Sequence, residues 1–197
     1  MNNLNAIIGI IGTLLGTILG WLLNQLSSKG KLKIFPAKWE DELYYFYSGV
    51  KRTAETVEQI KNYSYRCFLD VYNASSEPRV LRDVRIVFRN KKEELLSSVP
   101  QDEDTLHGES RLAYFDNIGP LTIGAKSAVR IKIRDSEQNG EGRDSFIWKT
   151  KRIYLTYRNE KNRLKRVLIH EEDYSKRFDN YTEEEQGNGK AENAQPE

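Results

Sequence analysis

The chain has 197 residues, with 31 basic and 29 acidic side chains, a formal net charge of +2 and a single cysteine. That cysteine, Cys67, excludes an intrachain disulfide, and it and the two histidines lie too far apart in the sequence to form the short-spaced His and Cys ligand pattern of a usual zinc site. No phosphate-binding-loop or EF-hand spacing occurs, so we expect no enzyme activity, no catalytic residue, no metal site and no cofactor.

The chain opens with an uncharged stretch of 28 residues, and residues 4–26 within it are apolar. A helix rises about 1.5 Å per residue, so 23 residues span roughly 34 Å, against a hydrocarbon core of about 30 Å. A cleaved signal peptide is disfavoured, because the first residues contain no Lys or Arg and the apolar run is too long. We expect a retained transmembrane helix at 4–26 and a juxtamembrane linker at 27–30.

Basic residues follow this segment directly, at Lys29, Lys31, Lys33 and Lys38. Lysine and arginine near a membrane span prefer the cytoplasmic side. The sequence therefore predicts a single-pass protein of the cell membrane, with its N-terminus outside and its C-terminal domain in the cytoplasm.

Small residues recur every four positions in the same segment, at Gly12, Gly16 and Gly20, and Asn24 continues the series. This spacing places them on one helix face, where small side chains let two helices approach closely. We expect this stripe to contact a second copy of the chain or the transmembrane helix of a partner.

From residue 31 onward apolar and polar residues alternate with period two, which is typical of strands with one buried face. One such face is Tyr63, Tyr65, Cys67, Leu69 and Val71. Shorter runs are expected at 31–35, 43–47, 84–88, 129–133, 151–158 and 163–169, the last two joined as a hairpin. Several short strands joined by turns predict a mainly β fold, an immunoglobulin-like antiparallel β-sandwich at 31–170. Residues 50–61 fit either a helix or a long loop.

The stretch from Asn73 to Phe88, Asn-Ala-Ser-Ser-Glu-Pro-Arg-Val-Leu-Arg-Asp-Val-Arg-Ile-Val-Phe, has the form of two sandwich strands joined by a loop. With the overall layout, it resembles small one-pass bacterial or phage membrane proteins that carry an immunoglobulin-like sandwich. The resemblance implies a fold and a location, and it transfers no functional residue.

Charge is distributed unevenly along the second half of the chain. Residues 126–170 hold 13 basic and 5 acidic side chains, whereas residues 171–197 hold 3 basic and 9 acidic ones. We expect a possible short helix at 171–181 and a disordered acidic tail at 182–197, which lacks large apolar residues. The basic residues predict an exposed basic face, composed of Arg130, Lys132, Arg134, Arg152, Arg158, Lys161, Arg163, Lys165 and Arg166.

These features favour a membrane-tethered binding, adaptor or sensor protein with an unknown protein partner, in a setting such as bacterial host defence or phage exclusion. A first alternative is a binder of anionic membrane lipid or nucleic acid that uses the basic face; no nucleic-acid motif supports the latter ligand. A second alternative is a divergent enzyme whose site is assembled from scattered residues such as Cys67, His107 or His170.

Overall fold

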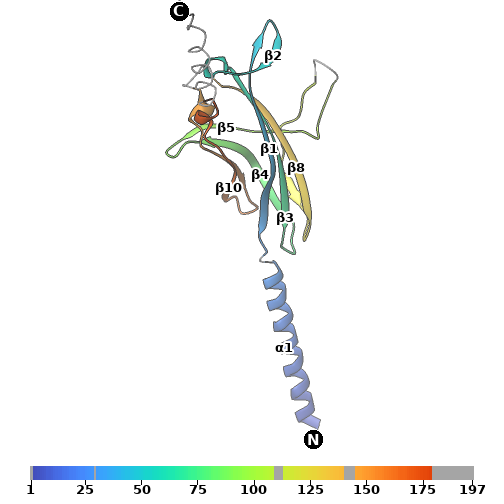
Figure 1. Ribbon diagram of the computed structural model, residues 1–197. Coiled ribbons are helices and arrows are strands. Elements are labelled where there is room, and N and C mark those ends of the chain that lie inside the picture. The colour runs from blue at the N-terminus through green and yellow to red at the C-terminus, as the bar shows by residue number, and fades with distance from the viewer. Residues whose placement is uncertain (1, 29, 109–112, 140–144, 179–197) are drawn as a thin grey trace, which may run out of the picture.

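The computed structural model describes residues 2–28, 30–108, 113–139 and 145–178 (Figure 1). A long helix, α1 (Asn2–Ser28), projects from one end of a β-rich body. The expected acidic tail at 182–197 lies outside the described residues, as does the end of the 171–181 segment.

The body contains two antiparallel sheets. The first has the strand order β2-β1-β3-β8-β6, and the second has the order β10-β9-β4-β5, with β7 paired to β4. The strands of the first sheet are β1 (Leu32–Tyr47), β2 (Val50–Thr53), β3 (Asn62–Asn73), β6 (Gln101–Asp102) and β8 (Ala128–Gln138). Those of the second are β4 (Arg79–Arg89), β5 (Glu94–Ser98), β7 (Leu121–Ile123), β9 (Arg152–Arg158) and β10 (Leu164–Glu171). Three short helical turns complete the described chain: η1 (Val57–Gln59), α2 (Phe146–Lys149) and η4 (Tyr174–Lys176).

The core lies between these sheets and takes side chains from both. The predicted inward face of β3 is confirmed, since every second residue from Tyr63 to Val71 is at most 2% exposed. Phe88 of β4, in the other sheet, meets Tyr63 and Tyr65 of β3 edge-on, with ring centroids 5.7 and 5.9 Å apart. Aromatic pairs at such distances and angles add to the stabilisation from buried apolar area.

The first strand differs from the expectation of two short ones. β1 is continuous over 16 residues and pairs with β3 along most of its length, with a register shift between Pro36 and Lys38. Proline cannot donate a ladder hydrogen bond, and the bulge restores the pairing beyond it. The charged middle of β1 hides the alternation on which the two-strand prediction depended.

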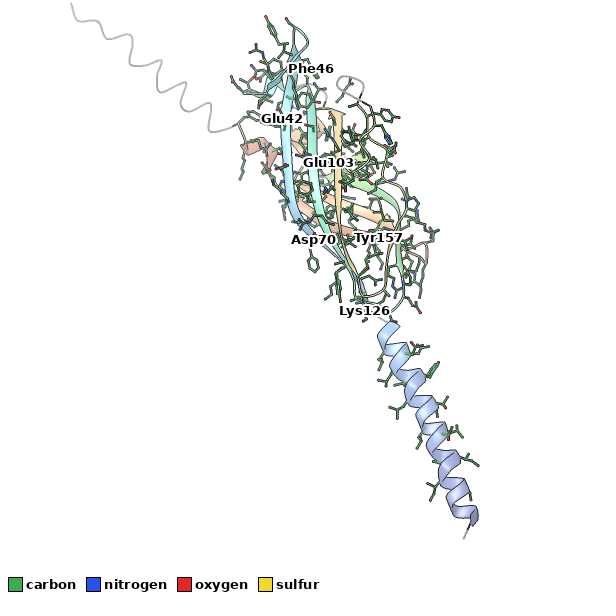
Figure 2. The ribbon with its side chains drawn as sticks, turned by 90° about the vertical axis from the view of Figure 1, so that its right-hand side faces the viewer. Glu42, Phe46, Asp70, Glu103, Lys126 and Tyr157 are labelled. Carbon is green, nitrogen blue, oxygen red and sulfur yellow. The ribbon has the colours of Figure 1, made fainter. Side chains whose placement is uncertain are left out.

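The helix considered for residues 50–61 is wrong. The chain turns back at Ser48 and Gly49, both with positive φ, so that β2 pairs with the end of β1 and η1 follows. Positive φ at both central residues is the geometry of a two-residue hairpin turn, for which a glycine at the second position is well suited. This hairpin and Phe46 lie at the end of the body far from α1 (Figure 2).

Candidate functional site

Helix α1 contains a 20-residue apolar stretch, Ile7–Leu26, that is long enough to cross a membrane, and none of it is buried against the body. The hydroxyls of Thr13 and Thr17 donate to the carbonyls of Gly9 and Thr13 one turn earlier, at 2.9 Å each. These polar side chains are therefore satisfied within the helix, as an apolar surrounding requires.

The predicted glycine stripe is open in the single chain. A Cβ atom added at Gly12, Gly16 or Gly20 would meet nothing within 4 Å, and Asn24 is exposed on the same helix. The space that a second helix would need along this face is thus present.

The four lysines predicted to set the orientation lie in different surroundings. Lys31 lines a groove beside α1, Lys33 lies opposite Tyr72 in the β1–β3 ladder, and Lys38 pairs with Glu40 at 2.5 Å. Lys29 lies outside the described residues.

The predicted basic face is not one surface. Arg130, Lys132 and Arg134 are on β8 of the first sheet, whereas the remaining members are on β9, β10 and their connection in the second sheet. The prediction of a single basic face assumed that strands close in sequence lie in the same sheet. β8, however, lies in one sheet, and β9 and β10 lie in the other. The basic set is corrected to two groups on different sheets.

Most members of the set also have internal partners. Arg130 donates two hydrogen bonds to Asp70, at 2.8 and 2.9 Å, and Lys132 contacts Asp104 at 2.8 Å. The other contacts are Arg134 over the ring of Phe115, Arg152 with Glu171, Arg158 with Asp83, and Arg166 over the ring of Tyr154. Within the described chain, no carboxylate pairs with Lys161, Arg163 or Lys165, all near the β9–β10 turn.

Two of these three, Lys161 and Lys165, line a groove of about 680 Å³ where α1 meets the body. The other lining residues come from the end of α1, the start of β1 and β4, and the β9–β10 turn: Gln25, Gly30, Lys31, Leu32, Glu77, Arg79, Val80, Tyr157, Asn159 and Glu160. Arg79 and Glu160 pair across it at 2.6 Å.

The loop between β3 and β4 holds this groove in shape through a buried polar network. Asn73 is fully buried, and its amide donates to the carbonyls of Glu77, Ile123 and Gly124 at 2.7 to 3.1 Å. Its side-chain oxygen accepts from the backbone and hydroxyl of Ser75 at 2.9 and 2.6 Å. Such saturated networks are rigid. Sequence reasoning identified the loop but not the role of Asn73.

Gly30 fits against this loop, because a Cβ atom there would overlap the Ala74 carbonyl. Arg79 reaches the same place, donating to the Ser75 hydroxyl at 3.0 Å and to the Gly30 carbonyl at 3.3 Å. The Lys126 ammonium, labelled beside α1 in Figure 2, donates to the Ala74 carbonyl at 2.7 Å. Gly30, which precedes Lys31 at the start of the body, is therefore packed against the β3–β4 loop.

A second polar cluster, the Asp41 cluster, joins β1 to the segment after β10. The Asp41 carboxylate has 6% of its side chain exposed and accepts from Tyr63 at 3.1 Å, Trp39 at 3.4 Å, Arg177 at 2.9 Å and the Tyr174 hydroxyl. Burial, followed by the nearby Asp41 charge, raises the pKa of Tyr174, so this hydroxyl remains a donor.

The ligand atoms of Asp41, His170 and Glu172 lie within 4.8 Å of one another, a spacing that suits a metal ion. However, Arg177 already donates to Asp41 at 2.9 Å and to Glu172 at 2.9 and 3.0 Å. Burial lowers the pKa of Arg177, but the two carboxylates more than offset it, so its pKa is raised. The guanidinium supplies the positive charge at this place, and the cluster is explained as an internal clasp.

The candidate reactive groups are likewise occupied. Cys67 is buried, and burial raises the pKa of its thiol to about 12, which suppresses the reactive thiolate. His107 bonds Asp116 at 2.8 Å and His170 bonds Glu172 at 3.0 Å. The three side chains are not brought together in one pocket among the described pockets.

Known proteins similar to this chain include one curated relative and two solved structures. The chain is 25% identical over 183 residues to the SPbeta prophage-derived uncharacterized protein YopI of Bacillus subtilis, covering 87% of this chain and 99% of that protein. A protein from Archaeoglobus fulgidus is 11% identical, with 68% of this chain and 90% of that chain covered and a TM-score of 0.32. The putative ApaA protein from Bordetella pertussis is 10% identical, with 73% and 91% covered and a TM-score of 0.32.

The model of a family described as the YopI Ig-like domain matches residues 30–170. The match includes strands of both sheets, begins after α1 and ends one residue before the end of β10. The chain belongs to the YopI Ig-like domain family.

Proposed function

We propose that this chain is a single-pass membrane protein whose immunoglobulin-like β-sandwich serves as a non-enzymatic binding, adaptor or sensor module on the cytoplasmic face of the cell membrane. The observation that carries the proposal is the exposed apolar stretch of α1, none of which is buried against the body. An exposed helix of this composition is costly in water and favourable in a bilayer.

The state of the reactive side chains supports a binding role. The thiol of Cys67 is buried, and both histidines hydrogen-bond carboxylates. Immunoglobulin-like domains present surfaces on a rigid framework, and the loops and exposed sheet faces are the places where a partner binds. The prophage origin of the Bacillus subtilis relative supports a role in host defence or phage exclusion as the biological setting.

The orientation is tested with reporters fused after Glu197. A reporter active only in the cytoplasm should be active, and one active only outside the cell should be silent. Replacing Lys29, Lys31, Lys33 and Lys38 together by glutamine should weaken this bias, because each supplies part of the positive-inside signal. The opposite reporter pattern would refute the proposed orientation.

Association through α1 is tested at Gly16, the centre of the glycine stripe. Gly16→Ile places a branched side chain where helix backbones would touch, and should reduce crosslinking between copies, or to a partner helix, by at least half. Membrane fractionation should be unchanged, because isoleucine favours the bilayer. The matched control is Ile18→Leu. Crosslinking of Gly16→Ile equal to that of the parent would leave α1 as an anchor only.

The alternative function is binding of an anionic ligand. Because the basic residues lie on two different sheets, a lipid headgroup is favoured over nucleic acid as that ligand. Arg130 and Lys132 are paired with carboxylates, which reduces the case for a continuous nucleic-acid face. The unpaired lysines lie near α1, where the expected anion is a lipid headgroup.

A further inference from the structure

The groove beside α1 lies at the level at which the helix leaves the bilayer. Gln25 of α1 lines the groove, and the apolar stretch ends at Leu26, the next residue. The headgroup layer adds roughly 5 to 8 Å to each side of the hydrocarbon core. In a membrane-inserted chain, Gln25 therefore borders the groove at the start of this layer.

The body side of the groove is packed at Gly30. Gly30 leaves no space against Ala74, and Arg79 ties its carbonyl to the β3–β4 loop. Because Asn73 and Ser75 fix that loop from inside, Gly30 and the loop form one packed part of the body at the edge of the groove.

The charge of the groove is positive. Its lining includes four cations and two carboxylates: Lys31, Arg79, Lys161 and Lys165, with Glu77 and Glu160. Arg79 and Glu160 neutralise each other, and in the part of the chain that the structure describes no carboxylate pairs with the three lysines. The C-terminal end of α1 contributes only about half a negative charge, which these lysines outweigh.

We propose that this groove binds the phosphate of an anionic phospholipid in the leaflet from which α1 emerges, with Lys31, Lys161 and Lys165 as its cationic contacts. The groove, of about 680 Å³, has room for a headgroup, and it is bordered by Gln25 of α1 and by residues of the body. The inference rests on the proposed membrane insertion, because only insertion brings a lipid phosphate to this depth.

The test uses the full-length chain in neutral detergent, incubated with phosphatidylglycerol or phosphatidylcholine, with the retained lipid counted by native mass spectrometry. The parent should retain phosphatidylglycerol in preference. The double variant Lys161→Gln and Lys165→Gln should bind phosphatidylglycerol roughly thirtyfold more weakly, because it removes two of the three cationic contacts. The matched control, Lys91→Gln with Lys92→Gln, makes the same charge change at the opposite end of β4 and should retain the lipid.

Two results would overturn the inference: equal retention of both lipids by the parent, or undiminished phosphatidylglycerol retention by the double variant. Added inorganic phosphate at the lipid concentration should not displace the lipid; full displacement would assign the groove to a soluble anion and refute the lipid assignment. Membrane fractionation of the parent in cells separates the two proposals. A chain that fractionates with membranes but shows no lipid preference loses this inference alone, whereas a chain absent from membranes loses the proposed function.

Discussion

The Asp41 cluster and the groove beside α1 are both built from charged residues, but they differ in the source of the opposite charge. The Asp41 side chain is only 6% exposed and receives its donors from the chain itself, Arg177 among them. Lys161 and Lys165 are exposed, and no described carboxylate pairs with them. Removing one partner of a charge pair inside a fold leaves the other charge uncompensated and destabilises the fold, while unpaired charge at an edge remains available to a ligand.

The largest expected effect comes from breaking the Asp41 cluster. Asp41→Asn should lower the free energy of unfolding by about 3 kcal/mol, near the lower end for breaking a buried ion pair, because Arg177 is partly exposed. Urea unfolding of the full-length protein in neutral detergent, followed by tryptophan fluorescence, measures the change.

The control for this variant is Asp70→Asn, which removes the exposed pair with Arg130. Its urea midpoint should equal that of the parent, since water solvates both groups. Equal midpoints for Asp41→Asn and Asp70→Asn would show that the cluster does not act as a clasp.

A smaller effect is expected at Asp135 on β8, where burial raises the pKa of the carboxyl. A raised folded-state pKa means that the folded chain binds the proton more tightly than the unfolded one. The contribution of Asp135 to stability is therefore greatest below its ordinary pKa, and is lost as the pH rises through the raised value. Asp135→Asn should gain stability relative to the parent between pH 4 and pH 7.

Urea midpoints of parent and variant at the two pH values give this difference directly. Glu58→Gln, at an exposed carboxylate of η1, serves as the control and should show no such trend. If Asp135→Asn shows no gain in stability relative to the parent, or a larger gain at pH 4 than at pH 7, the Asp135 carboxyl is better solvated than its burial implies.

The smallest effect is expected at the groove. Lys161→Gln with Lys165→Gln should leave the free energy of unfolding within about 0.5 kcal/mol of the parent, because these side chains stabilise nothing inside the fold. The same urea titration measures it. A marked loss of stability would show that these lysines stabilise the fold, as Asp41 is expected to do, and the two sites would then not differ in this respect.

Much of the strand pattern was predictable. The inward residues of β3 alternate strictly, and the polar turn between β9 and β10 was visible in the sequence. The hairpin of β1 and β2 was missed, although Ser48-Gly49 between two runs of strand-forming residues was a usable signal. The continuous β1 was hidden because four of its central residues, from Lys38 to Glu42, are charged and only Trp39 is not.

The sites were less predictable than the strands. The sequence marked Lys161 and Lys165 as basic, and it contained no sign that Lys132 has an internal partner while they do not. In the sequence, Asp41 has the pattern of an ordinary surface charge in a polar segment. No residue near it in the sequence predicts its contacts with Tyr174 and Arg177. These partners lie more than 130 positions away.

The sequence by itself determined the apolar helix, the change to a β-rich body at residue 31 and the buried face of each regular strand. These features depend on the spacing of apolar residues within one segment, and burial of one helix or strand face follows directly from that spacing. Only the tertiary structure decided which sheet each strand joins, and so which charges meet a partner. Pairing between distant strands places Arg130 beside Asp70 and leaves Lys161 and Lys165 at the end of α1, because the identity of a neighbour across a sheet depends on the fold as a whole.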